Sequence, residues 1–249
     1  MLTRTFIHVP GVGYTTETKL WRHGSLTWQD FLRAYPDLPL PRAKQDHIRA
    51  WLLESEAALA ARDQAFFGRL LPRREHWRLF PEFSDSIVYL DIETTGLGSA
   101  DVVTLVGLYD GADYRAYIRG IDLPEFPREV ARFSLLVTYF GTCFDLPFLG
   151  QEFPGLRFGQ SHIDLCYLLR RLGYTGGLKR VEEKLGIERS AETRGLSGYD
   201  AVRLWREYER GDRSALELLV RYNMEDVMNL EGLMNFAYRE LCRQLGFCI

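Results

Sequence analysis

The alternation of apolar and polar positions is strongest in the middle of the chain. Residues 86–92 are rich in β-branched and aromatic side chains, and the runs 102–109 and 114–118 have the same character, with Gly and Asp between the runs. Short runs of this composition bounded by turn residues are typical of consecutive strands. We therefore predict three strands joined by short turns in this region.

The chain then alternates between strands and helices. Successive strands followed by such alternation indicate an α/β or α+β fold in which helices cover a sheet. The sequence predicts a fourth strand at 135–139, a helix at 144–153, a short strand at 162–164, and helices that begin near Leu165, Leu178, Gly198 and Arg213.

The N-terminal part of the chain has a helical pattern of apolar residues. From Lys44 to Arg69 apolar residues recur at spacings of three and four, which predicts one long amphipathic helix. The stretch 71–85 is rich in proline, charged and aromatic residues, a composition typical of a connection between domains. We place the boundary there, between a helical region, 1–81, and a second domain, 82–249.

Residues 7–32 contain a glycine turn, Gly11-Val12-Gly13, followed by Thr and Glu at a helix start and by another glycine that ends this helix. The pattern of helix, tight turn and helix resembles the helix-hairpin-helix element. In that element a glycine-rich turn presents backbone N–H groups to a nucleic-acid phosphate. The resemblance implies that Gly11 and Gly13 contact nucleic acid, and the alternative is a small helical cap with a glycine turn.

Composition narrows the class of protein further. With 249 residues, 46% of them hydrophobic, the chain can bury a full core. Its longest apolar stretch, around 135–140, is far below the roughly 18 residues that a membrane span needs, and the N-terminus does not read as a secretory signal. Four scattered cysteines without a CxxC pair favour neither a zinc site nor a disulfide framework. We expect a cytoplasmic protein without membrane association, and a net charge of −3 argues against indiscriminate wrapping of nucleic acid.

The segment Tyr89–Leu97, YLDIETTGL, carries the first candidate chemistry. Asp91 and Glu93 are two residues apart on a predicted strand, so their side chains share one face while Leu90 and Ile92 point into the core on the other. Two adjacent carboxylates repel each other when no cation is present. This pair is therefore unfavourable for stability and indicates a metal site.

Two later motifs supply further acidic residues. Asp145 follows Phe144 at the start of a predicted helix, where it could also be read as a helix N-cap. Tyr222 and Asp226 are four residues apart in a late helix, so they lie on one helix face and can point at one centre. Four carboxylates are hard oxygen ligands, which suit Mg²⁺ or Mn²⁺ and not zinc or copper.

The strings DIETTGL, FD and Y-x-x-x-D, in this order, resemble the DEDD superfamily of 3′–5′ exonucleases over roughly residues 85–249. With Tyr222 in place of a histidine, the chain is similar to the tyrosine branch, DEDDy. Together with the front helical element it also resembles a bacterial group known mainly as predicted exonucleases. The resemblance implies a ribonuclease H-like mixed five-stranded sheet flanked by helices. One departure is Phe140-Gly141-Thr142, near where the family usually has an Asn.

The resemblance also implies roles for individual residues. Asp91, Glu93, Asp145 and Asp226 would hold two divalent cations, Mg²⁺ or Mn²⁺, with Asp91 bridging both, and the Tyr222 hydroxyl would orient the attacking water. The substrate would be single-stranded DNA or RNA, cut from its 3′ end. Contacts to the nucleic acid are expected from Thr94, Thr95, Gly96, Leu97 and Phe144.

Several assignments stay open at this point. Lys179 and Arg180 could contact a substrate phosphate or lie on a solvated helix face, and Asp164 is read as a cap or as a neighbour of the carboxylates. His162 is read as structural, and aromatic residues such as Phe140 could stack on bases but more often belong to the core. A structure-selective endonuclease and a non-catalytic nucleic-acid-binding module are the rival functions, because a fold does not fix a function. The sequence does not determine whether a protein partner delivers the substrate.

Overall fold

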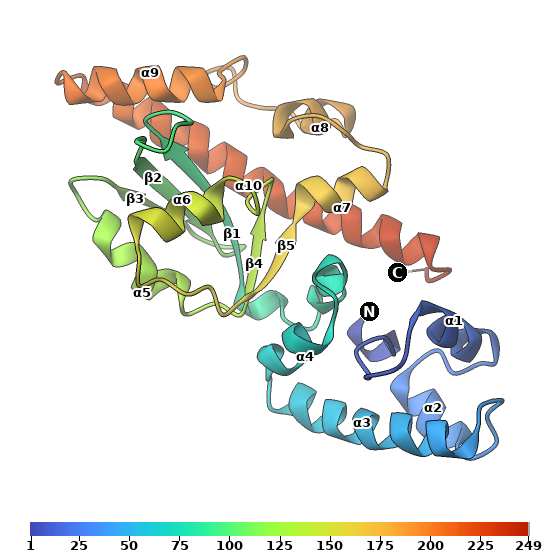
Figure 1. The fold of residues 1–249 in the computed structure, drawn as a ribbon. Helices are drawn as coiled ribbons and strands as arrows, with labels where there is room; N and C mark the ends of the chain where they lie inside the picture. Colours follow the sequence, from blue (N-terminus) through green and yellow to red (C-terminus); the bar gives the residue numbers. More distant parts are fainter. Residues whose placement is uncertain (249) are drawn as a thin grey trace. The chain divides into compact units, whose positions relative to one another are not determined.

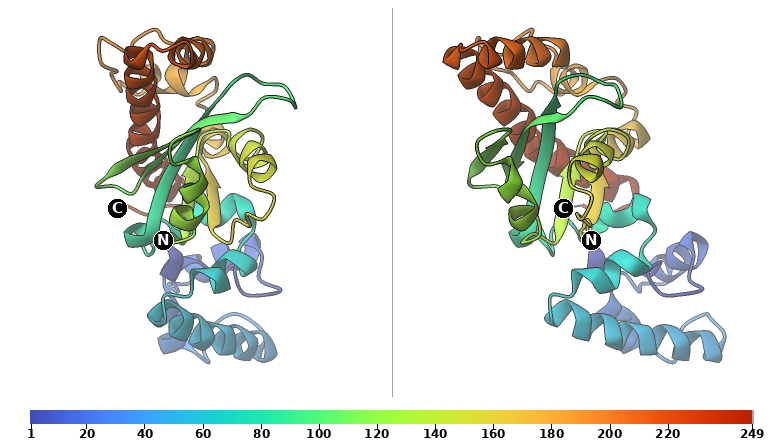
Figure 2. Two further views of the ribbon diagram at one scale, coloured as in Figure 1. Left: turned by 90° about the vertical axis from the view of Figure 1, so that its left-hand side faces the viewer. Right: turned by 60° about the vertical axis from the view of Figure 1, so that its left-hand side comes forward.

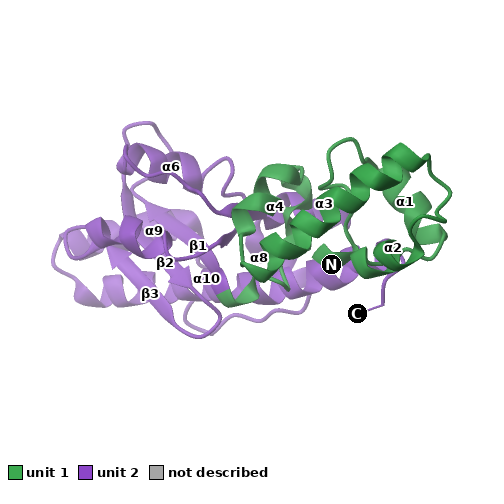
Figure 3. Ribbon diagram, turned by 90° about the horizontal axis from the view of Figure 1, so that it is seen from below, with its two compact units in different colours: residues 1–85 green, residues 86–249 purple. Residues whose placement is uncertain are grey.

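The computed structural model describes residues 1–248. The chain divides into two compact units, residues 1–85 (unit 1) and residues from Ser86 onward (unit 2), which Figure 3 colours separately. The division falls close to the boundary that the sequence places after residue 81.

Unit 1 consists of helices, which Figure 1 draws in blue and cyan, and its core is aromatic. Its centre contains Trp28, Phe31 and Phe67, all at most 2% exposed. A capping box of Thr27 and Asp30 begins the helix that carries Trp28, because each side chain accepts a backbone N–H of the other residue. The helices are α1 (Tyr14–Arg22), α2 (Trp28–Ala34), α3 (Arg42–Ala60) and α4 (Gln64–Leu70), with 3-10 helices at Leu2–Arg4, Arg73–Leu79 and Ser84–Ser86.

The prediction of one long helix over 44–69 is wrong. Helix α3 ends at Ala60, and α4 begins at Gln64. Between them Arg62 adopts a left-handed backbone with φ of 57°. The Asp63 side chain then accepts the N–H of Phe66 and caps the new helix. The apolar spacing continues across this break, so periodicity alone does not reveal it.

The glycine turn of unit 1 precedes α1. Gly11 is left-handed, with φ of 77°, and Gly13 is the N-cap residue of α1. Within residues 1–13, all of which the structure describes, the turn is preceded by the 3-10 helix Leu2–Arg4 and not by an α-helix. The likeness to a helix-hairpin-helix element therefore extends to the turn and the helix after it, and the nucleic-acid role of the two glycines stays a prediction.

A buried ion network ties together the ends of unit 1. Arg78 donates to Glu17 at 3.0 Å and to Glu75 at 2.8 Å, and all three side chains are at most 3% exposed. Glu17 also accepts the backbone N–H of Phe6 at 2.7 Å. Burial raises the pKa of Glu17, while the Arg78 charge opposes that rise. The network thus joins the N-terminal segment, α1 and the 3-10 helix at Arg73–Leu79.

Unit 2 is built on the mixed five-stranded sheet that the sequence predicts, and α/β is the observed class. The strand order is β3-β2-β1-β4-β5. Strand β1 is antiparallel to β2 and parallel to β4, so it lies at the centre of the sheet. The strands are β1 (Ile87–Thr94), β2 (Val103–Tyr109), β3 (Tyr114–Ile118), β4 (Leu135–Thr138) and β5 (Ser161–Asp164).

Helices cover both faces of this sheet, as Figure 2 shows in side view. On one face Val88 and Leu90 pack with Phe126 and Leu149 of α5 and α6. On the other face Leu105 packs against residues of α9 and α10. The helices of unit 2 are α5 (Phe126–Val130), α6 (Asp145–Glu152), α7 (Leu165–Arg171), α8 (Leu178–Lys184), α9 (Gly198–Glu209) and α10 (Arg213–Gln244).

The alternation along β1 orients the acidic pair. Leu90 and Ile92 point into the core beneath α5 and α6, as predicted. Asp91 lies opposite Gly107 on β2, and Glu93 lies opposite Leu105, whose face packs against α10. Both carboxylates therefore face the long C-terminal helix. None of the helices in residues 1–248 is apolar and long enough to cross a membrane.

We predict that Arg78→Met lowers the free energy of unfolding by about 3 to 5 kcal/mol, because the buried carboxylates of Glu17 and Glu75 lose their shared cationic partner. Urea denaturation of the full chain measures this change. Arg33→Met is the matched control, since Arg33 is 75% exposed and pairs with Asp30 on the surface; its loss should stay below about 1 kcal/mol. Equal losses in the two variants would contradict the role given to Arg78.

Candidate metal centre

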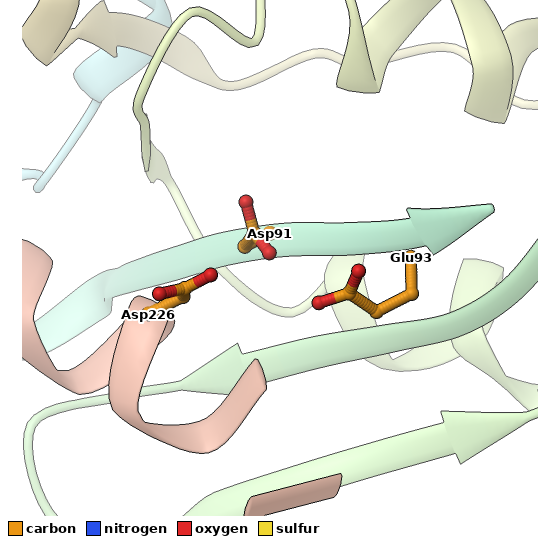
Figure 4. Close-up of side chains that lie close together, drawn as sticks. All are labelled: Asp91, Glu93 and Asp226. Atoms are coloured by element: carbon orange, nitrogen blue, oxygen red, sulfur yellow. The ribbon is translucent and has the colours of Figure 1, made fainter. Parts of the chain in front are cut away.

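Three carboxylates from two distant segments come together in unit 2. Asp91 and Glu93 belong to β1, and Asp226 belongs to α10 (Figure 4). One oxygen of each carboxylate lies within 4.8 Å of the others. Glu93 and Asp226 are each 6% exposed, and Asp91 is partly exposed. The chain thus gathers three hard oxygen ligands at one point, a donor set that fits Mg²⁺ or Mn²⁺.

Asp145, the first residue of α6, is not one of these three residues, but it lies near enough to Asp91 for its charge to raise the pKa of Asp91. The N-cap residue of α6 is Phe144, so the interpretation of Asp145 as the N-cap is wrong. Its side chain is 2% exposed, and among the described residues its Oδ1 has no hydrogen-bond partner. A buried carboxylate oxygen without a partner is costly, which fits an additional ligand or a water-mediated contact to a cation.

The electrostatics of the cluster reflect burial and mutual repulsion. Burial and the neighbouring carboxylates raise the pKa of Asp91 and of Glu93 well above their ordinary values. Burial likewise raises the pKa of Asp145 to about 7, and that of Asp226 to about 6 despite the opposing charge of Arg189. Charging all four groups is unfavourable unless positive charge is supplied, and a divalent cation would supply it.

Arg189 already provides part of that positive charge. Its guanidinium contacts Asp226 and forms two hydrogen bonds to Glu182, at 2.7 and 2.8 Å. Glu182 is 1% exposed and also accepts from Asn229 at 2.9 Å. Arg189 thus links the segment after α8 to a candidate metal ligand. Sequence reasoning missed it, because Arg189 lies in an irregular loop where neither spacing nor a motif distinguishes it.

Tyr222 lies one helical turn before Asp226 and is 4% exposed. Its hydroxyl accepts a hydrogen bond of 2.7 Å from Lys179, whose ammonium lies 4.2 Å from the centre of the Tyr222 ring. Burial and the charge of Asp226 raise the pKa of Tyr222, so the hydroxyl keeps its proton. The solvated-face reading of Lys179 is therefore wrong, whereas its neighbour Arg180 is exposed.

Asn223 is a second residue that sequence reasoning missed. It is fully buried, and its amide nitrogen lies 3.0 Å from Asp91 Oδ2 and 3.4 Å from Glu93 Oε1. Its position next to Tyr222 and three residues before Asp226 was the available signal, because side chains three apart share a helix face.

The last residue of β1 and the turn after it contain four of the predicted nucleic-acid contacts. The hydroxyl of Thr94 donates to the carbonyl of Gly96 at 2.6 Å, and that of Thr95 donates to Asp101 at 2.8 Å. A Cβ on Gly96 would lie 2.6 Å from the Asp101 carboxylate, so glycine allows this close approach. Both threonines therefore hold the turn together, and Leu97, 84% exposed, is the residue of this group most available to a ligand.

The two aromatic residues considered for contacts with nucleic acid, Phe144 and Phe140, differ in burial. Phe144 packs against Phe148, with ring centres 4.9 Å apart, beside the sheet core. Phe140 is 44% exposed and has φ of 67°. Asp164 accepts the backbone N–H groups of Phe140 and Thr142, at 2.8 and 3.0 Å, and so holds this turn.

Asp164 is also the N-cap residue of α7, which confirms its predicted role as a cap. His162 and Thr138 form a hydrogen bond of 2.8 Å between neighbouring strands, in agreement with a structural role for the histidine.

The other two predicted nucleic-acid contacts, Gly11 and Gly13, belong to unit 1, whereas the carboxylates belong to unit 2.

We predict that Asp145→Asn is more stable than the wild type at pH 8 in chelator, by up to about 4 kcal/mol. Because the pKa is raised in the folded state, ionisation of Asp145 lowers the free energy of unfolding progressively between about pH 4 and pH 7. Above pH 7 this loss of stability is constant. Asn cannot ionise, so the difference should close toward pH 4. Urea denaturation at several pH values measures it.

The control for this experiment is Asp212→Asn at the N-cap of α10. Hydrogen bonds from Ser214 lower the pKa of Asp212, so the pH dependence of this substitution should have the opposite sign. A difference between Asp145→Asn and the wild type that does not change with pH would contradict the electrostatic description.

We predict that Arg189→Met lowers the free energy of unfolding in chelator by about 3 to 5 kcal/mol, because buried Glu182 and Asp226 lose their cationic partner. Arg203→Met is the control, since Arg203 is 51% exposed and pairs with Glu207 on a helix surface; its effect should stay below about 1 kcal/mol. Chemical denaturation compares the two. A loss for Arg189→Met as small as that of the control would rule out a supporting role.

The chain is similar to one protein family and to several solved structures. A family model described as the RNase_H superfamily matches residues 88–238. A family B DNA polymerase from the archaeon Pyrobaculum calidifontis is similar with a TM-score of 0.47 and 19% identity, covering 63% of this chain and 24% of the polymerase. The Nibbler EXO domain of Aedes aegypti is similar with a TM-score of 0.40 and 13% identity, covering 69% of this chain and 86% of that domain.

This chain therefore corresponds to only about a quarter of the polymerase. No curated protein sequence matches it. The family model, in contrast, spans most of unit 2, including the parts of β1 and α10 that carry Asp91, Glu93 and Asp226. On this match and on the observed sheet, the chain belongs to the RNase_H superfamily.

Proposed function

We propose that the chain is a metal-dependent nuclease that removes nucleotides from the 3′ end of single-stranded DNA or RNA. The observation that carries the proposal is the meeting of Asp91 and Glu93 with Asp226, one helical turn after Tyr222, in an RNase_H superfamily domain. Three buried or partly buried carboxylates at this spacing have little structural use without a cation.

Asp91, Glu93 and Asp226 would hold the metal directly, and Asp145 would add its unpartnered Oδ1 or reach the metal through water. Two divalent cations, Mg²⁺ or Mn²⁺, bound there would activate a water molecule and stabilise the charge that develops on the phosphate. The donor set consists of carboxylate oxygens, which is the chemistry that these two ions prefer.

The remaining residues supply orientation and positive charge. Because Lys179 donates to the Tyr222 oxygen, the proton of that hydroxyl is free to donate to a water molecule or to a phosphate oxygen. Lys179 and Arg189 would offset part of the negative charge of the substrate. The exposed side chains of Leu97 and Phe140 are available for contacts with bases.

The experiment is to incubate the full chain with 5′-labelled single-stranded RNA, single-stranded DNA and duplexes with overhangs, in Mn²⁺, in Mg²⁺ and in chelator. A metal-dependent ladder that shortens from the 3′ end supports the exonuclease and reveals the preferred sugar. Internal cuts would favour an endonuclease on the same site. A gel shift without cleavage in any metal would overturn the nuclease and favour a binding module.

We predict that Asp91→Ala and Asp226→Ala lower cleavage to the background level while the chain stays folded, because each removes a metal ligand. Tyr222→Phe should slow cleavage roughly 100-fold, as expected for the loss of one oriented donor. Tyr199→Phe is the matched control, since Tyr199 is 81% exposed, and it should cleave like the wild type. Full activity of Asp91→Ala would rule out the proposed site.

A further inference from the structure

Asn223 contacts the acidic pair from the side of α10 and has no role in the function proposed so far. Its side chain is fully buried. The amide nitrogen is 3.0 Å from Asp91 Oδ2 and 3.4 Å from Glu93 Oε1, so its two N–H groups can serve one carboxylate each. A neutral donor thus lies between two groups that otherwise repel.

A tyrosine on another strand fixes the orientation of this amide. The hydroxyl of Tyr114, on β3, donates to Asn223 Oδ1 at 3.0 Å. Burial and the charges of Glu93 and Asp91 raise the pKa of Tyr114, so this hydroxyl keeps its proton and remains a donor. An oxygen held by a donor on one side leaves the NH₂ group facing the carboxylates on the other.

A glycine makes room for the same amide. Gly107, on β2, lies opposite Asp91, and a Cβ there would lie 1.8 Å from Asn223 Oδ1 and 3.0 Å from a methyl group of Val227. No side chain larger than hydrogen fits without displacing Asn223. Residues of β1, β2, β3 and α10 therefore all converge on this one amide.

We infer that Asn223 is a positioning residue that holds Asp91 and Glu93 in the paired arrangement to which a divalent cation binds. The inference rests on the proposed function, because it assigns a purpose to the metal site. Asn223 contacts a single oxygen of each carboxylate, which leaves the other oxygen, and further lone pairs, to a cation. Groups that orient metal ligands in this way typically contribute about 10- to 100-fold to metal affinity.

The opposing possibility is that the amide only substitutes for the cation and is displaced when the cation binds. Removing Asn223 would then leave the affinity unchanged or increase it. The two cases differ in the sign of the change in affinity, so binding of the metal alone, without nucleic acid, separates them.

The first experiment titrates Mn²⁺ into the full chain by calorimetry, with Asn223→Ala and with Asn223→Leu, which preserves the shape of the side chain. We expect the dissociation constant to rise about 10- to 100-fold in both variants. Asn235→Ala is the matched control, since Asn235 is an exposed residue of the same helix that bonds to the Glu231 carbonyl. Affinities of both Asn223 variants equal to or above that of the wild type would overturn the inference.

The second experiment asks whether Gly107 and Tyr114 act through Asn223. Gly107→Ala and Tyr114→Phe should each weaken Mn²⁺ binding, and neither should weaken it further when Asn223 is already Ala, because contacting residues are not additive. Additive losses would overturn the inference. If Gly107→Ala does not fold, the comparison of Tyr114→Phe with the double variant Tyr114→Phe, Asn223→Ala still provides the test.

Nuclease assays on the same samples separate this inference from the proposed function. If the wild type binds Mn²⁺ but cleaves no substrate, the proposed nuclease function is wrong, and the Mn²⁺ titration alone decides the role of Asn223. A wild type that cleaves, together with Asn223 variants that bind Mn²⁺ normally, overturns only the role of Asn223. A wild type that binds no divalent cation overturns both.

Discussion

The repulsion among carboxylates at the contact between β1 and α10 is the constraint on which the rest of unit 2 depends. Asp91, Glu93 and Asp226 lie within 4.8 Å of one another, in surroundings that raise the pKa of all three. Buried like charges separate or protonate unless the chain holds them and supplies compensation. Unit 2 holds the carboxylates in place with packed apolar layers. Polar side chains around the cluster offset part of its negative charge.

The frame consists of the two apolar layers. Strand β1 is central in the sheet, so its alternation sends Leu90 into one core and Asp91 toward the other face. Helix α10 packs on that face through residues such as Leu219 and presents Asp226 from the same side. Burial of apolar surface therefore fixes the positions of groups that would otherwise move apart.

The negative charge of the cluster is partly compensated by residues that are far apart in the chain. Arg189 contacts Asp226, Asn223 donates to the pair on β1, and Lys179 donates to Tyr222. The guanidinium and the ammonium bring positive charge, whereas the amide brings only oriented N–H groups and so leaves the negative charge available to a cation. Under the proposed function, the negative charge that these partners leave unneutralised is what a divalent cation would bind.

The sequence by itself determined the strands, most helix starts and the shared face of Asp91 and Glu93, because period-two alternation and i, i+4 spacing are local geometry. It did not reveal the break at Arg62, which depends on a local cap, nor Arg189 in its irregular loop. Only the tertiary structure decided which partners surround the acids, since Gly107 and Asn223 meet through packing between a strand and a helix more than 100 residues apart. Helical spacing indicates that Asn223 and Asp226 share a helix face, but the groups that this face meets follow from how the layers stack.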